Sequence, residues 1–406
     1  MSLRITGLGE EIGSVIGLPW EQPLEQWPED PILAEKRGIS RHVVRLVRSD
    51  EEDPNSEIYA VKETVVEFAK REYKALIELK KLGAPSVEPV AVIEGRTDTA
   101  GEELPCAIAT RFLPYSLPYR VVLSQSVSEH DINNMANALA YLLVQLHLLG
   151  FWWGDCSLSN TLFRRDAESF AAYLVDAETG EFQTRLSDGQ REHDLEIAFF
   201  NVAAELEDLQ LSGVLYEGMD PIRASEAVQR RYRRLWSALK DPKKLDPNDR
   251  HAVERAMREL HDLGFAVEEV QVSLDNETHM LSFQPRLVAA GYHSAKLKNR
   301  FGLDAQELQA KRILASFDRW YARQPNKTSK DEMAKEWLDT VFFKILDLIP
   351  AELLGRVEKA QMFHEILENR WYMTEKAGFD VGLEVAAEAY INEILPLRMD
   401  SGVETE

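Results

Sequence analysis

Hydrophobic and polar residues alternate along much of the segment from residue 31 to residue 113, which is the period-2 pattern of half-buried β-strands. A helical pattern interrupts the alternation between residue 64 and Gly83. We expect Val65, Phe68, Leu76 and Leu79 to form the apolar face of this helix, flanked by Tyr73 and Ile77. The segment therefore predicts a small sheet with one inserted helix, in which the five strands are 31–36, 41–47, 57–63, 86–95 and 103–113.

After Pro118 the pattern becomes mainly helical. An apolar helix is predicted for residues 131–149, and Gly150 ends it. A loop and a short apolar strand, which ends at Asp176, come next. A further helix is predicted at 194–208, and the charged segment 224–263 is predicted to be helical, with Gly264 closing it.

The last third of the chain changes character again. Alternating residues on both sides of Asp275 predict a β-hairpin. From Asp304 onward the pattern indicates three or four helices. The clearest of them begins at Ser329, with Glu332 at the capping-box position, and runs to Pro350.

Length and composition favour a soluble chain of more than one domain. Its 406 residues exceed a typical domain of roughly 150 residues, and 45% hydrophobic and 29% charged residues are close to globular averages. The two cysteines form no CxxC pair and the first residues lack the apolar run of a signal peptide, so we expect a reducing, cytoplasmic location. Polar residues spread along the uncharged stretch 132–154 favour a buried helix over a transmembrane segment.

The net charge of −22 makes nucleic acid an unlikely partner for the surface as a whole. The segment 291–330 is a local exception, because it contains nine basic and three acidic residues. A solvated face is the simpler interpretation of this basic segment, and an anionic ligand or a protein partner is the alternative.

Five polar residues in the first half follow an order that suits phosphoryl transfer. Lys62 lies near the end of a predicted strand, Glu72 lies on the next helix, Asp155 and Asn160 share a loop, and Asp176 ends the following strand. Such a lysine can hold the α- and β-phosphates of ATP while the helix glutamate orients it. The loop aspartate can accept a proton from an attacking hydroxyl, and the other two side chains can ligate Mg²⁺ through oxygen.

These residues resemble the motifs of a protein-kinase-like fold. Ala60-Val61-Lys62 is similar to the kinase lysine strand, residues 154–160 to the catalytic loop, and Asp176 to the aspartate of the magnesium loop. The short loops and the Gly-Asp-x4-Asn form look most like the atypical branch that includes lipopolysaccharide-core (Kdo and heptose) kinases. The resemblance covers about residues 30–225 and suggests an actinobacterial protein with an additional C-terminal domain. By the same analogy, Asp194 braces the catalytic loop from behind.

The resemblance implies an α+β, bilobal fold. We expect an N-terminal extension and five-stranded N-lobe at 1–114, a helical C-lobe at 115–225, and a mostly helical domain with one β-hairpin at 226–406. Gly38 and Ser40, in the turn that would cover the nucleotide, are the predicted additional cofactor contacts.

Two functions follow from the resemblance. The first is an ATP- and Mg²⁺-dependent phosphotransferase that acts on a hydroxyl of a small molecule, sugar or glycolipid precursor. The second is a nucleotide-binding pseudokinase that works as a regulatory or scaffold module. The pseudokinase alternative stays open for two reasons. The turn that would cover the nucleotide has one glycine where kinases often have three, and Ala177-Glu178 replace the Phe-Gly of the magnesium loop.

Simpler interpretations exist for single residues. Lys62 could be a solvated lysine and Asn160 could cap a turn, so their support comes from the ordered set. Glu72 has no oppositely charged residue at helical spacing, which favours a partner from elsewhere in the chain. His293 and His364 have no convincing set of metal ligands around them in the sequence, and we assign no metal to either.

Overall fold

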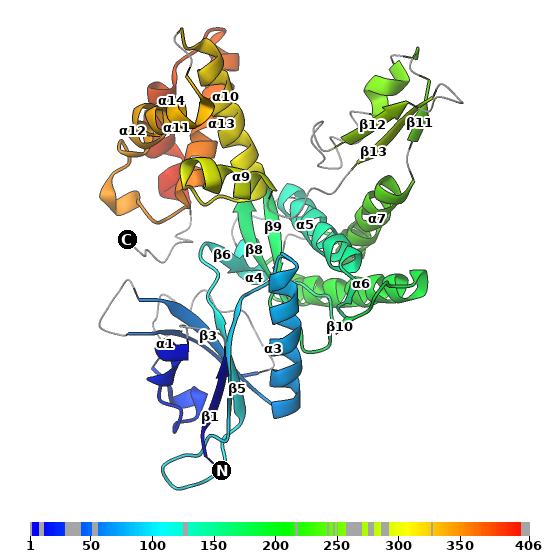
Figure 1. The fold of residues 1–406 in the computed structure, drawn as a ribbon, viewed down its shortest axis with the longest axis vertical. Helices are drawn as coiled ribbons and strands as arrows, with labels where there is room; N and C mark the ends of the chain where they lie inside the picture. The colour runs from blue at the N-terminus through cyan, green and yellow to red at the C-terminus, as the bar shows by residue number, and fades with distance from the viewer. Residues whose placement is uncertain are drawn as a thin grey trace.

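Three structural parts follow one another along the chain in the computed structural model (Figure 1): a small sheet with one long helix, a mainly helical lobe, and a C-terminal helical bundle. The structure describes residues 2–7, 12–28, 42–50, 56–124, 129–215, 218–241, 243–246, 248–249, 251–256, 270–274, 280–285, 292–325 and 328–398. Every structural statement below concerns these residues.

The N-terminal sheet is antiparallel and has five strands, in the order β1-β4-β5-β3-β2. The prediction of five strands is confirmed for β2 (Val44–Arg48), β3 (Ile58–Thr64), β4 (Pro89–Glu94) and β5 (Cys106–Arg111). The remaining strand, β1 (Arg4–Gly7), was not predicted; it comes from the N-terminal extension and pairs with β4. The predicted strand 31–36 lies outside the described residues.

Helix α3 (Val66–Lys81) follows β3 and packs on one face of this sheet. The prediction of the helix is confirmed, but the apolar face predicted for it is wrong in part. Val65 and Phe68 are exposed, whereas the buried face includes Glu72 and Tyr73 beside Leu76. Leu76 and Leu79 are buried as predicted, so the buried face differs from the prediction only at the start of the helix.

The N-terminal extension covers the other face of the sheet. Trp20 and Trp27 lie edge to face, 5.0 Å apart, and their core includes Val15, Leu24 and inward residues of β3, β4 and β5. On this face Glu63 accepts a 2.6 Å hydrogen bond from the fully buried guanidinium of Arg96. Because neighbouring residues of a strand point to opposite faces, Lys62 points the other way.

The helical lobe has one core shared by four helices: α4 (Tyr119–Leu123), α5 (Glu129–Leu148), α6 (Asp188–Leu211) and α7 (Pro221–Lys240). Helix α7 contributes Val228, Tyr232 and Leu235 to this core. The predicted domain boundary after residue 225 therefore falls inside a helix that packs on the kinase-like lobe.

Short strands position the loops of the helical lobe. A three-stranded sheet has the order β6-β8-β9, formed by β6 (Ser116–Pro118), β8 (Thr161–Asp166) and β9 (Ser169–Leu174). A second pair joins β7 (Phe151–Trp152) to β10 (Glu181–Phe182). The β8–β9 hairpin extends from the centre of the molecule toward the helical bundle (Figure 1).

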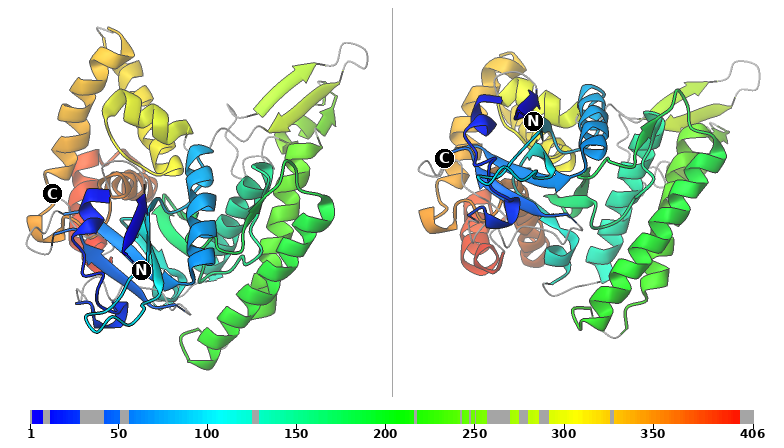
Figure 2. Two further views of the ribbon diagram at one scale, coloured as in Figure 1. Left: turned by 60° about the horizontal axis from the view of Figure 1, so that its bottom comes forward. Right: turned by 90° about the horizontal axis from the view of Figure 1, so that it is seen from below.

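A small sheet after α7 stands apart from the bundle (Figure 2). The predicted hairpin is confirmed, since β12 (Val270–Leu274) pairs with β13 (Leu281–Pro285). A third strand, β11 (Lys243–Leu245), joins them. The segment 224–263, predicted to be helical, is helical up to Lys240 and again at 251–256, and β11 interrupts it.

The C-terminal bundle has its own core, which excludes the kinase-like lobe. Phe317, Trp337, Phe342 and Phe363 are fully buried there, with ring centroids 4.8–6.1 Å apart in four of their pairs. Its main helices are α9 (Tyr292–Phe301), α10 (Glu307–Arg323), α11 (Lys330–Trp337), α12 (Phe343–Leu346), α13 (Lys359–Ala377) and α14 (Leu383–Glu393). The predicted capping box at Ser329 and Glu332 is confirmed. Among the described helices, none has the length and apolar character needed to span a membrane.

Gly150 ends α5 directly before the strand and loop that carry Asp155. Its φ is +78°, and a Cβ there would lie 2.2 Å from the carbonyl oxygen of Gln183. We predict that Gly150→Ala lowers the free energy of unfolding by about 2 kcal/mol or more, because it adds both backbone strain and a clash with backbone. Gly189→Ala is the control, since a Cβ there meets nothing within 4 Å on α6. Urea denaturation of both variants measures the difference, and an equal effect of the two substitutions would contradict it.

Candidate active site

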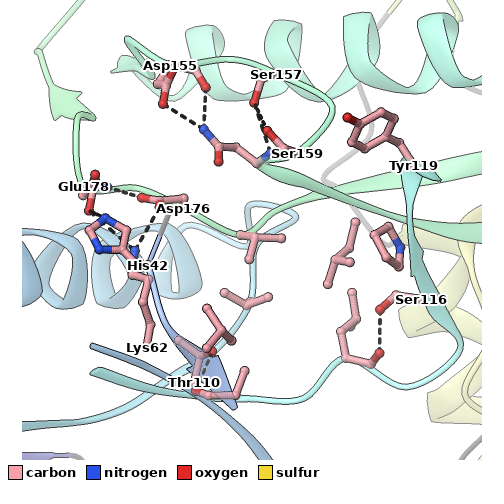
Figure 3. A pocket seen from close by; sticks show the side chains of 18 of the residues that line it. His42, Lys62, Thr110, Ser116, Tyr119, Asp155, Ser157, Ser159, Asp176 and Glu178 are labelled. Carbon is pink, nitrogen blue, oxygen red and sulfur yellow. Dashed lines mark hydrogen bonds and ion pairs between the residues drawn. The ribbon is translucent and has the colours of Figure 1, made fainter. Parts of the chain in front are cut away.

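A cavity of about 440 Å³ lies between the five-stranded sheet and the helical lobe (Figure 3). Apolar side chains from β2, β3 and β5 form one wall, and Leu162 and Val175 belong to the other. The predicted site residues within the described chain all line this one cavity: Lys62, Glu72, Asp155, Asn160 and Asp176. Gly38 and Ser40 lie outside the described residues.

Lys62 is held by two carboxylates from different elements. Its Nζ lies 2.7 Å from Glu72 Oε2 on α3 and 2.9 Å from Asp176 Oδ2 after β9. The Glu72 side chain is 2% exposed and that of Lys62 12%. A buried charge is stable only when it is paired. Glu72 lies on the buried face of α3, and Lys62 points from β3 toward the same side of the sheet, so the two charges form a pair.

Glu178 adds a third carboxylate that sequence reasoning did not assign to the site. Its Oε2 lies 3.6 Å from Lys62 Nζ and 3.7 Å from His42 Nε2, and its backbone N–H donates to Asp176 Oδ1. Ligand oxygens of Glu72, Asp176 and Glu178 lie within 4.8 Å of one another, an arrangement that can hold a metal ion. The only available signal was that Glu178 stands where kinases have glycine.

Burial and charge act in opposite directions on the Lys62–Glu72 pair. Burial raises the pKa of Glu72 to about 8, against the lowering effect of Lys62, and the charges of Asp176 and Glu178 raise it further. Burial alone would lower the pKa of Lys62, but Glu72 and Asp176 raise it above its ordinary value. Three carboxylates around one lysine leave an excess of negative charge, which a divalent cation would neutralise.

Asp155 is oriented by two amide side chains. Asn160 Nδ2 donates to Asp155 Oδ2 at 2.9 Å and to its backbone carbonyl at 3.0 Å. Asn201 Nδ2 donates to Asp155 Oδ1 at 3.1 Å and to the carbonyl of Cys156 at 3.2 Å. Sequence reasoning missed Asn201, although a polar residue within the apolar run of its helix was a signal.

The catalytic loop is fixed from behind by Asp194, which confirms the predicted brace. The backbone N–H groups of Trp153 and Gly154 each donate to Asp194 at 2.8 Å. His147 Nε2 lies 3.0 Å from the same carboxylate, and its Nδ1 lies 2.6 Å from the Tyr232 hydroxyl. This fully buried chain of contacts connects the loop to α5, α6 and α7.

A second carboxylate of α6, Glu205, holds the far side of the loop. It accepts backbone N–H groups of Leu158 at 2.8 Å and Ser159 at 2.9 Å. Burial raises the pKa of Glu205, while these hydrogen bonds oppose the rise. Nothing in the sequence distinguished Glu205 from the other acidic residues of its helix, so only the fold could identify it.

Four of the nine basic residues of the segment 291–330 are in ion pairs. Lys298 lies 2.8 Å from Asp304, Arg300 lies 2.8 Å from Asp331, and Lys330 pairs with Asp318. Arg312 pairs with Glu168 of the kinase-like lobe. An anionic ligand or a protein partner at this segment stays a prediction.

The site and the fold are those of a kinase-like domain. Comparisons with known proteins show which kinases it resembles. Residues 57–212 match the model of the lipopolysaccharide kinase (Kdo/WaaP) family, and residues 234–395 match that of a domain of unknown function, DUF4032. A solved structure of WaaP in complex with acyl carrier protein is 17% identical, covers 64% of this chain and 99% of that chain, and has a TM-score of 0.36. No curated protein matches the chain. The two family matches show a kinase-like fold that resembles the lipopolysaccharide-core kinases, followed by a C-terminal region that resembles DUF4032.

The raised pKa of Glu72 predicts a pH-dependent stability. The native state binds the Glu72 proton more tightly than the unfolded chain does, with a pKa of about 8 against 4.5. The stabilisation is therefore complete below about pH 4.5 and is lost as the pH rises to about 8. We expect the free energy of unfolding of the wild type to fall over this range by at least about 1 kcal/mol more than that of Glu72→Gln, since one pKa unit corresponds to about 1.4 kcal/mol.

Urea denaturation at pH 5, 7 and 9 measures this difference. Glu78→Gln is the matched control, because Glu78 is a half-exposed carboxylate on the same helix. The control should retain the pH dependence of the wild type. The same pH dependence in Glu72→Gln would contradict the prediction.

Proposed function

We propose that the protein is an ATP- and Mg²⁺-dependent phosphotransferase that acts on a hydroxyl of a small molecule, sugar or glycolipid precursor in the cytoplasm. One observation carries the proposal: Lys62 contacts both Glu72 and Asp176 in the cavity that Asp155 also lines. In kinases a lysine held in this way binds the nucleotide phosphates. The match to the lipopolysaccharide kinase family supports a kinase-like phosphotransferase.

The residues around Lys62 suit a magnesium nucleotide. Asp176 and Asn160 are the proposed Mg²⁺ ligands, and Glu178 is a third candidate, because Mg²⁺ prefers oxygen donors. The ion would neutralise charge on the β- and γ-phosphates. Lys62 would bind the α- and β-phosphates, and the apolar walls of the cavity would receive the base.

Asp155 is the proposed general base. The acceptor oxygen forms a bond to the γ-phosphorus while the bond from that phosphorus to the β-phosphate oxygen breaks, and ADP leaves. The acceptor proton passes to Asp155. Amide donors on both carboxylate oxygens fix the direction of this side chain, and a carboxylate keeps further lone pairs for the acceptor hydroxyl.

The acceptor side of the cavity is polar. Tyr119, Arg120, Ser157 and Ser159 are among the residues that line the cavity, and Ser157 and Ser159 lie on the same loop as Asp155 (Figure 3). Hydroxyl groups and a guanidinium can bind a hydroxyl-rich or anionic molecule. This lining supports a small polar acceptor, whose identity the proposal leaves at the level of its chemical class.

Calorimetric titration with ATP, with and without Mg²⁺, tests the nucleotide site. We expect Mg²⁺-dependent binding by the wild type and by the control Glu78→Gln, and a loss of at least about 10-fold in affinity for Asp176→Asn, because one metal ligand is removed. Equal affinity in all three proteins would reject Asp176 as a ligand. Absence of binding to the wild type would reject the nucleotide site.

Phosphoryl transfer to a panel of sugars and glycolipid precursors tests the base. We predict that Asp155→Asn keeps the affinity for magnesium ATP and lowers kcat roughly 10²- to 10⁴-fold, the usual contribution of general base catalysis. Transfer at the wild-type rate would reject Asp155 as the base. Nucleotide binding by the wild type without any turnover would favour the pseudokinase.

A further inference from the structure

The joint between the kinase-like lobe and the C-terminal bundle is built around the β8–β9 turn. Asp166 accepts the backbone N–H groups of Leu308 at 3.1 Å and Gln309 at 2.9 Å, at the start of α10. The side chain of Gln361, on α13, exchanges two 3.1 Å hydrogen bonds with the backbone of Ala167. The turn is therefore fixed against both helices.

Three potential metal ligands meet beside this turn. Glu168 is the second residue of the turn, while His364 and Glu368 lie one helical turn apart on α13. One ligand atom from each lies within 4.8 Å of the other two. Residues four apart on a helix share a face, so the α13 pair is arranged to bind one ion together.

The buried imidazole of His364 is an independent observation that points to a ligand at this place. Its side chain is 1% exposed, and neither ring nitrogen has a hydrogen-bond partner within the described residues. Its Nε2 faces the Glu168 carboxylate at 3.8 Å, which is too long for a hydrogen bond. Buried polar groups almost always have a partner, and an ion is one of the recognised explanations for an exception.

Carboxylates gather at this place, and a bound cation would reduce their mutual repulsion. Burial raises the pKa of Glu368, and the charges of Glu168 and Glu365 raise it further, so the carboxylates repel one another. Burial lowers the pKa of His364, which keeps the imidazole neutral and able to coordinate. Arg312 already pairs with Glu168 and is the cation with which a metal must compete.

We propose that Glu168, His364 and Glu368 bind one transition-metal dication, with Zn²⁺ as the best-matched ion, across the joint between the two domains. An imidazole with two carboxylates is a typical Zn²⁺ ligand set, whereas Mg²⁺ and Ca²⁺ prefer oxygen alone. Three protein ligands leave a fourth position for water. The ligand atoms, which lie within 4.8 Å of one another, must come closer together to coordinate one ion. The Glu168 side chain is 40% exposed and has room to move.

The ion would act as a cross-link, since one ligand belongs to the kinase-like lobe and two belong to the C-terminal bundle. Sequence analysis assigned no metal to His364, because Glu168 lies almost 200 positions earlier in the chain. Only the fold places these residues together. The site is separate from the carboxylates around Lys62 and does not depend on the proposed function.

Equilibrium dialysis of the full chain against Zn²⁺ in excess Mg²⁺ tests the proposal, because Mg²⁺ occupies all-oxygen sites. We expect the wild type to bind one Zn²⁺ more than Glu368→Gln or His364→Gln, whose affinity falls about 10- to 100-fold or more. Glu375→Gln, an exposed residue on the same helix, is the control and should match the wild type. Equal Zn²⁺ uptake by all four proteins would overturn the proposal.

Thermal unfolding supplies a second readout. Zn²⁺ should raise the midpoint of the wild type and of Glu375→Gln but not that of Glu368→Gln, because a ligand that binds only the native state stabilises it. Arg312→Gln removes the competing cation and should bind Zn²⁺ more tightly than the wild type. Loss of Zn²⁺ binding in Arg312→Gln, or an equal shift in Glu368→Gln, would contradict the assignment.

Discussion

The buried contact between Lys62 and Glu72 is the constraint on which the kinase-like part depends. Neither charge is stable alone in an apolar interior, so β3 and α3 must be placed so that the two meet. In this placement Glu72 lies on the buried face of α3 with Ala69 and Leu76, and Phe68 is left exposed. The same lysine then fixes Asp176 and, through it, the end of β9.

A second set of buried polar contacts gives the catalytic loop its shape. Asp194 and Glu205, both on α6, accept four backbone N–H groups from residues 153–159. The loop therefore has little conformational freedom of its own, and α6 determines where Asp155 lies. Asn201 is on the same helix. Helix α6 therefore supplies both carboxylates that hold the loop and one of the amides that orient Asp155.

Sequence patterns predicted the features that depend on local order and missed those that depend on distant contacts. Lys62, Glu72, Asp155, Asn160 and Asp176 were found because their order along the chain is typical of kinases. Strand β1 was missed because its four residues have no distinctive pattern, and they form a strand only by pairing with β4, almost 90 residues later in the chain. Glu205 and the Glu168–His364 pair were missed for the same reason, since each partner is far away in the sequence.

The β8–β9 hairpin connects the two halves of the molecule mechanically. Asn160 precedes one of its strands and Asp176 follows the other, while the turn at its opposite end is clamped by α10 and α13. Six residues per strand correspond to a ribbon of about 20 Å. At this length, a rotation of the ribbon by about 3° at its turn would move its other end, beside Asn160 and Asp176, by about an ångström.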